Sequence, residues 1–91
     1  MAITKTAFTL WAIQHGYALD KYGHLQKTIA HNDSNGLPTT TTYRYKLSAI
    51  AARKEIKVNH EHGGNSWTRL FSGYFSKMSI NDKDQLEGMK R

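Results

Sequence analysis

Residues 39–47, TTTTYRYKL, constrain the fold of this chain more than any other stretch. The β-branched threonines favour extended backbone, and successive side chains of a strand point to opposite faces of a sheet. Tyr43 and Tyr45 therefore share one face with Leu47, and Arg44 and Lys46 share the other. We expect the tyrosines to face the core and the cations to face water, so that rings and cations occupy opposite surfaces.

The same alternation resumes in KEIKVNH, residues 54–60, where Ile56 and Val58 are expected inward and Glu55 and Lys57 outward. Residues 48–55, SAIAARKE, are ambiguous between a helical turn, one long bent strand and two strands. If the two alternating segments pair antiparallel, one basic patch forms, although the register is not fixed by the sequence. Its members would be Arg44, Lys46, Arg53 and Lys57.

Turn and cap signals divide the rest of the chain. Residues 3–16, ITKTAFTLWAIQHG, predict a helix in which Thr4 caps the first turn and Gly16 ends the last. Residues 20–23 are expected to form a hairpin turn, and residues 31–38, HNDSNGLP, the clearest loop. Towards the end, residues 78–91, MSINDKDQLEGMKR, indicate a small hairpin that turns at 81–84, followed by a frayed basic terminus.

Residues 66–78, SWTRLFSGYFSKM, match two templates. Helical spacing groups six apolar side chains on one face, and Ser66 would cap that helix. The aromatic content and the internal Gly73 favour a strand instead, with a bend or bulge at the glycine. The sequence leaves both open. The expected fold is α+β: an N-terminal helix packed on a small antiparallel sheet of three to five strands, with or without a second helix at 66–78, in a single small domain spanning residues 1–91.

Charge indicates the class of partner. The chain has 13 Lys and Arg residues against 7 Asp and Glu, a formal net charge of +6 and a pI near 9.7. Such a protein attracts nucleic acid, a nucleoprotein complex or an acidic protein surface, and its few acids exclude a protein that imitates DNA. No apolar run is long enough to enter a membrane or act as a signal peptide, so we expect a cytoplasmic protein. The candidate contacts are the cations Arg44, Lys46, Arg53, Lys57, Arg69 and Lys77 and the aromatic residues Trp67, Tyr74 and Phe75.

Trp67 in particular is compatible with either of two positions. It follows a glycine-rich loop and is adjacent to Arg69, as expected of a surface residue that stacks on bases or on a protein partner. Core packing is the alternative, as it is for Trp11 on the apolar face of the expected helix.

Signals for catalysis are weak. There is no cysteine, no glycine-rich phosphate loop and no serine in a nucleophile elbow. His60 and His62 would point the same way from a strand, but zinc requires three or four ligands, and the third would have to be a distant residue such as His24, His31 or Asp33. We therefore expect neither an enzyme nor a cofactor or metal.

Three functions remain open. The leading one is a non-enzymatic module that binds nucleic acid through its Lys and Arg face, with steep salt dependence and little sequence preference. The second is a small inhibitor or adaptor of the kind that phages and mobile elements encode, which binds a host protein or nucleoprotein complex, for example in a defence system; its location would be the host cytoplasm. The third is a self-associating structural subunit.

Overall fold

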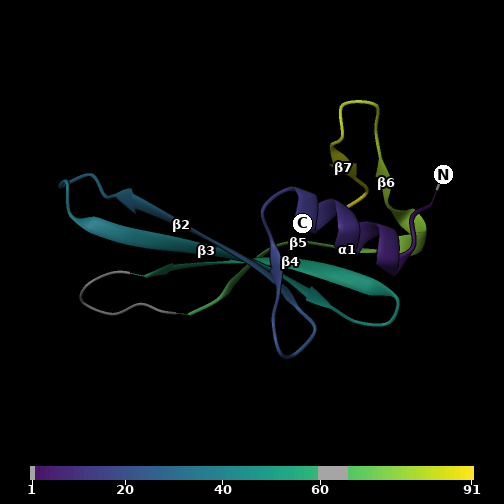
Figure 1. The fold of residues 1–91 in the computed structure, drawn as a ribbon, viewed down its shortest axis with the longest axis horizontal. Coiled ribbons are helices and arrows are strands. Elements are labelled where there is room, and N and C mark those ends of the chain that lie inside the picture. The colour runs from purple at the N-terminus through teal and green to yellow at the C-terminus, as the bar shows by residue number, and fades with distance from the viewer. Residues whose placement is uncertain (1, 60–65) are drawn as a thin grey trace.

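The structure is a computed structural model that describes residues 2–59 and 66–91. One α-helix packs on a five-stranded antiparallel sheet, and a small two-stranded sheet lies beside it, which confirms the expected α+β class (Figure 1). The strand order follows the chain, β1-β2-β3-β4-β5. In sequence the elements are α1 Lys5–Gln14, β1 Ala18–Leu19, β2 Leu25–Asn32, β3 Pro38–Leu47, β4 Ala51–Asn59, β5 Thr68–Tyr74, the 3₁₀ turn η1 Phe75–Lys77, β6 Ser79–Ile80 and β7 Leu86–Glu87.

Helix α1 begins and ends where the sequence predicts. The Thr4 hydroxyl accepts a hydrogen bond from the backbone N–H of Ala7 at 3.1 Å, which satisfies one of the free donors of the first turn. At the other end Gly16 has φ +92°, the left-handed conformation that stops a helix at little cost for glycine.

Short turns join the strands. The Asp20 carboxylate accepts from the backbone N–H groups of Tyr22 and His24, and these bonds hold the pKa of Asp20 below its usual value. The loop predicted at 31–38 is shorter than expected, because β2 and β3 pair as far as Asn32 and Pro38. Ser48 fixes the next turn, in which its hydroxyl accepts from the N–H of Ala51. Residues 48–55 therefore consist of a turn after β3 and the beginning of β4.

The core lies between α1 and one half of the sheet. Phe8 is fully buried and meets the Tyr45 ring edge-on, with 4.9 Å between the ring centres. The Tyr45 hydroxyl donates a hydrogen bond to Tyr17, and burial raises the pKa of both phenols. The remaining buried core residues are Ala12, Leu25, Ala52, Phe75 and Met78.

Beyond this core the sheet continues without the helix. The molecule measures 44 × 26 × 25 Å, and Figure 1 shows β2, β3 and the neighbouring ends of β4 and β5 extending away from α1. Within residues 2–59 and 66–91, no helix is long and apolar enough to cross a membrane.

Residues 66–78 form a strand and a 3₁₀ turn, so the helical alternative is wrong. Two irregularities explain the misleading spacing: Leu70 is an extra residue in the pairing of β5 with β4, and η1 turns Phe75 and Met78 into the core. Gly73 is needed because a side chain there would lie 2.9 Å from the Gly88 carbonyl oxygen.

The C-terminal segment is paired with the sheet as far as Lys90, so the expectation of a frayed terminus is wrong up to that residue. The backbone groups of Lys90 and Ser72 exchange two hydrogen bonds of 2.8 Å, which fasten the segment to the edge of β5. The hairpin before it has the predicted turn, with Asn81 and Asp84 joined by a backbone hydrogen bond of 3.0 Å.

Candidate functional site

The predicted cations of β3 and β4 lie together on the face of the sheet opposite α1. In the register of these strands Lys46 is directly across from Arg53, and Arg44 is across from Glu55. Lys57 lies across from Thr42, on the same face. Glu55 pairs in turn with Arg69, so the charged face extends to β5. We call this surface the basic face; it consists of Arg44, Lys46, Arg53, Glu55, Lys57, Trp67 and Arg69.

The sheet holds the whole net charge of the chain. Its five strands contain seven of the thirteen Lys and Arg residues but only one of the seven acids, Glu55. The other residues therefore balance, with six cations against six acids. A charge of +6 that appeared spread along the sequence is concentrated in one structural element.

Glu55 lies beneath the basic face and organises it. Its side chain is 9% exposed, and Oε1 accepts from Arg44 Nη2 at 2.6 Å and from Arg44 Nε at 3.0 Å. Arg53 Nε is 3.3 Å from Oε2, but its N–H is not directed at that oxygen, so this contact is an ion pair without a hydrogen bond. The single carboxylate is thus occupied by Arg44, and its charge is shared with Arg53.

Trp67 brings an aromatic ring to the same surface. The Arg44 guanidinium carbon lies 3.8 Å from the ring centre, and Lys57 Nζ lies 4.8 Å from it. Trp67 is half-buried and does not belong to the core cluster. The expectation that the tyrosines face away from Arg44 and Lys46 holds for Tyr45, which is 3% exposed on the other face. Of the two positions expected for Trp67, the structure has the one beside the surface cations.

The remaining sequence candidates divide into three groups. Tyr74 is 57% exposed and lines a hollow with Lys77 and Lys90 at the end of β5. Phe75 is only 5% exposed in the core, so its burial removes it from the aromatic contacts. His60 and His62 lie outside the described residues; among those described, no three His, Cys, Asp or Glu side chains are arranged to hold a metal ion.

A groove on the basic face connects its strands to that hollow. Lys46, Arg53 and Ser72 line the groove, and Ser72 and Ala51 belong to both depressions. The distance from Trp67 to Tyr74 along β5 is about 20 Å at the usual rise per strand residue. The cations therefore lie along one continuous strip, with the Trp67 ring at one end and the Tyr74 ring at the other.

No protein family, curated protein or solved structure matches the chain.

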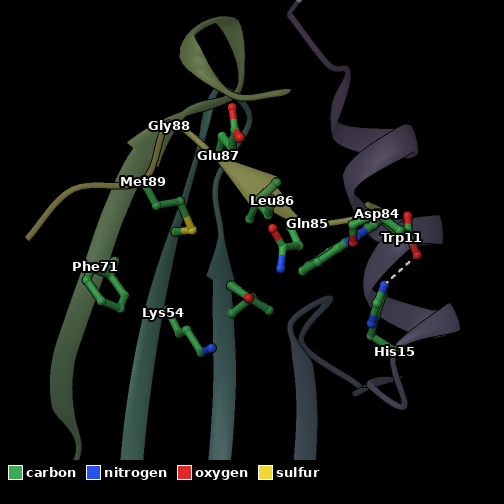
Figure 2. Close-up of a pocket in the computed structure, with 11 residues that line it drawn as sticks. Trp11, His15, Lys54, Phe71, Asp84, Gln85, Leu86, Glu87, Gly88 and Met89 are labelled. Carbon is green, nitrogen blue, oxygen red and sulfur yellow. Dashed lines mark hydrogen bonds and ion pairs between the residues drawn. The ribbon is translucent and has the colours of Figure 1, made fainter. Parts of the chain in front are cut away.

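The opposite face of the sheet holds a pocket that the sequence reasoning missed. It lies between the sheet, α1 and the β6–β7 hairpin (Figure 2). The side chains of Tyr45, Lys54 and Phe71 form its floor, since these residues are neighbours across β3, β4 and β5. The alternation that points Ile56 inward also points Lys54 inward, and this is the signal that the sequence carries for its position.

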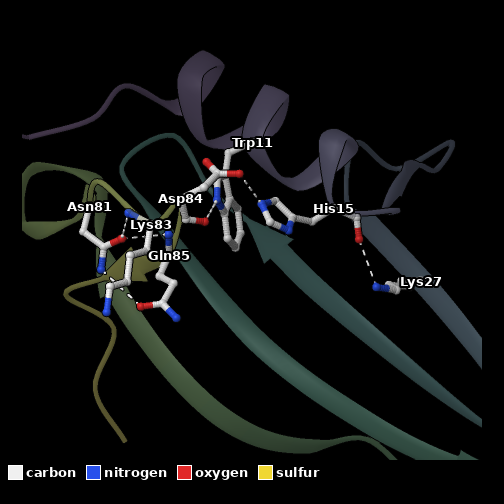
Figure 3. A network of polar contacts seen from close by, with 7 residues as sticks. All are labelled: Trp11, His15, Lys27, Asn81, Lys83, Asp84 and Gln85. Atoms are coloured by element: carbon white, nitrogen blue, oxygen red, sulfur yellow. Dashed lines mark hydrogen bonds and ion pairs between the residues drawn. The ribbon is translucent and has the colours of Figure 1, made fainter.

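A polar network fastens the hairpin over this pocket (Figure 3). The Trp11 indole Nε1–H donates to the backbone oxygen of Asp84 at 2.9 Å, and His15 Nε2 is 2.8 Å from the Asp84 carboxylate. Lys27 Nζ donates to the backbone oxygen of His15 at 2.9 Å. The end of α1 is thereby tied to both the hairpin and β2.

Proposed function

We propose that the protein is a non-enzymatic binding protein that holds nucleic acid on the basic face of its sheet. The observation that carries the proposal is that five of the seven cations of the sheet lie on this one face, with a single buried carboxylate among them. Lys46, Lys57 and Arg69 make no ion pair within the part of the chain that the structure describes, and phosphates are suitable partners for such cations.

The individual cations have different roles. Arg44 is 18% exposed and is occupied by Glu55 and Trp67, so it stabilises the surface. Lys46 and Arg69 are exposed, and Arg53 is 42% exposed, so these side chains reach a ligand. Lys46 and Arg53 lie directly across from each other, and the repulsion between them is relieved when a phosphate binds between them.

The dimensions of the strip suit a single strand. A strip of about 20 Å is long enough for several consecutive phosphates of one strand. Trp67 and Tyr74 offer rings to bases at the two ends of the strip, and stacking on such rings tolerates any base. Contacts to phosphates and ring faces carry no sequence information, so we expect weak sequence preference.

The proposed role is binding without catalysis. Among the described residues the basic face has one carboxylate, and Arg44 already engages it, so this carboxylate is not free to act as a general base. Nucleic acid as the partner would locate this activity in the cytoplasm, that of the host cell if the protein is encoded by a phage.

The experiment is fluorescence anisotropy of labelled single- and double-stranded DNA and RNA at about 50 mM and about 200 mM salt, a range over which several phosphate contacts cost orders of magnitude in affinity. Tight binding that collapses at the higher salt supports the proposal. Absence of binding at the lower salt refutes it. In that case recovery of one defined complex from nuclease-treated host lysate would favour the inhibitor or adaptor function.

A further inference from the structure

The pocket on the opposite face has the size of a small-molecule site. Its volume is about 590 Å³, within the usual range for ligand pockets. Trp11, Leu86 and Met89 supply apolar walls from α1 and the segment around β7, above the floor that includes Phe71. In Figure 2, Phe71 and Lys54 project from adjacent strands into the space below Leu86 and Met89.

Lys54 is the unusual residue in this lining. It is half-buried between Tyr45 and Phe71, and its ammonium lies 5.5 Å from the Tyr45 ring centre and 5.2 Å from that of Tyr43. Burial, and then the nearby charge of Lys27, lower the pKa of Lys54. Neither residue has a carboxylate partner, because the ion pairs among the described residues involve only His15, Arg44 and Arg53 on the cationic side.

The acidic residues of the pocket are engaged elsewhere. The Asp84 carboxylate pairs with His15, and Glu87 Oε1 accepts from Asn81 Nδ2 at 2.9 Å. Figure 2 shows the Glu87 carboxylate at the opposite end of the pocket from the Lys54 ammonium. The pocket therefore combines one unpaired cation, ring faces beside it and acids held at its far rim.

We propose that this pocket binds a small organic anion with a flat apolar ring, whose anionic group pairs with Lys54 and whose ring packs against Phe71 and Leu86. An anion at this position would supply the partner that Lys54 lacks and would reduce its repulsion with Lys27. A ring bearing a phosphate and a ring bearing a carboxylate share this chemistry. The site is independent of the basic face, since it lies on the other side of the sheet.

The two tryptophans of the chain allow each face to be monitored separately, because Trp11 lines the pocket and Trp67 lies on the basic face. The indole N–H resonances of the full-length ¹⁵N-labelled protein are followed by NMR during titration with adenosine monophosphate or indole-3-acetate, and with uncharged adenosine as the control. A saturable shift of the Trp11 indole resonance by either anion, with a much smaller response to adenosine, supports the proposal. A response to the monophosphate alone identifies a phosphate ligand, and a response to indole-3-acetate alone identifies a carboxylate ligand.

Variants of Lys54 make the test decisive. Lys54→Met keeps the length and packing of the side chain and should weaken binding by about tenfold or more, the effect of losing one hydrogen bond to a charged group, whereas Lys54→Arg should retain it. Lys57→Met, on the basic face, should leave the Trp11 response unchanged. The proposal is overturned if neither anion shifts the Trp11 resonance at about 10 mM, a concentration that would nearly saturate a site with a dissociation constant of about 1 mM. It is also overturned if adenosine shifts the resonance as much as the anions do, or if Lys54→Met binds them like the native protein. A response confined to Trp67 would count against this site while leaving the basic face intact.

Discussion

The guanidinium of Arg44 lies over the ring of Trp67, 3.8 Å from its centre, while the same group donates two hydrogen bonds to Glu55. This arrangement connects β3, β4 and the residue that precedes β5 through side chains on the face that α1 leaves uncovered. It also explains why the half-buried Trp67 lies on a charged surface. The Arg44 guanidinium pairs with the Glu55 carboxylate and at the same time makes a cation–π contact with the Trp67 ring.

Trp67 is expected to contribute to nucleic-acid binding through its ring. Trp67→Ala should weaken binding of a single strand by about 1–3 kcal/mol, the usual value of one stacked base, and Trp67→Phe should lose less. The measurement is anisotropy at constant low salt. Trp11→Phe is the matched control because Trp11 lies on the other face, and an affinity unchanged by Trp67→Ala would contradict the role of the ring.

Glu55 should affect stability and binding in opposite directions. Glu55→Gln removes the buried negative charge that Arg44 and Arg53 share, and the free energy of unfolding should fall by about 1.5–3 kcal/mol, as for other hydrogen bonds to charged groups. The variant makes the basic face more positive, so affinity for nucleic acid should rise or stay equal. Urea unfolding and anisotropy measure the two effects, and Glu87→Gln, at an exposed position, is the stability control. Reduced affinity in a folded Glu55→Gln variant would count against the proposed surface.

Gly88 should be intolerant of any side chain. It has φ +99°, and an added Cβ would collide with the backbone carbonyl of Lys77. Gly88→Ala should therefore destabilise the protein by about 3 kcal/mol or more, since a left-handed conformation alone costs roughly 1–2 kcal/mol. Gly36→Ala separates the two effects, because φ is +77° there but nothing lies within 4 Å of the added atom. Equal losses in thermal or urea unfolding would show that the C-terminal segment does not pack as described.

Tyr45 should make the protein sensitive to alkali. Its folded pKa is raised above the ordinary value of 10.0, first by burial, so the unfolded chain loses this proton at lower pH than the folded one. The stabilisation that the protonated phenol contributes is complete below about pH 10 and is lost as pH rises towards the folded pKa. The free energy of unfolding falls by at most about 1.4 kcal/mol per pH unit in this range. Unfolding in urea at about pH 8 and about pH 11 should show a larger loss for the native protein than for Tyr45→Phe. Identical pH dependence in the two proteins would contradict the buried, protonated phenol.

The parts of the fold that were predictable depend on local physics. The Thr4 cap, the Gly16 terminator and the alternation of residues 39–47 each follow from a few neighbouring residues, and the structure has all three. Residues 66–78 were not predictable in the same way, because a strand with an extra residue followed by a 3₁₀ turn imitates helical spacing. Only pairing with β4 and the approach of Gly88 to Gly73 distinguish the two forms, and both are long-range contacts.

The candidate site was half predictable for the same reason. Alternation places Arg44 and Lys46 on one face, but the register that aligns Lys46 with Arg53 depends on the turn at Ser48. The position of Trp67 over Arg44 depends on a third strand. Lys54 was overlooked because its environment is formed by residues from α1 and the β6–β7 hairpin, far away in sequence.

The central claim is tested most directly by the salt dependence of binding to one labelled single strand, measured for the native protein and for the double variant Lys46→Glu with Arg53→Glu. With four or more phosphate contacts, the plot of log K against log salt for the native protein should have a slope of about −3 or steeper. The double variant should bind much more weakly, with a slope shallower by about 1–2, because each lost phosphate contact removes about 1. Lys83→Glu, in the exposed β6–β7 turn, changes the net charge without touching the basic face and should keep the native slope. Equal affinity and equal slope in the native protein and the double variant would contradict the account.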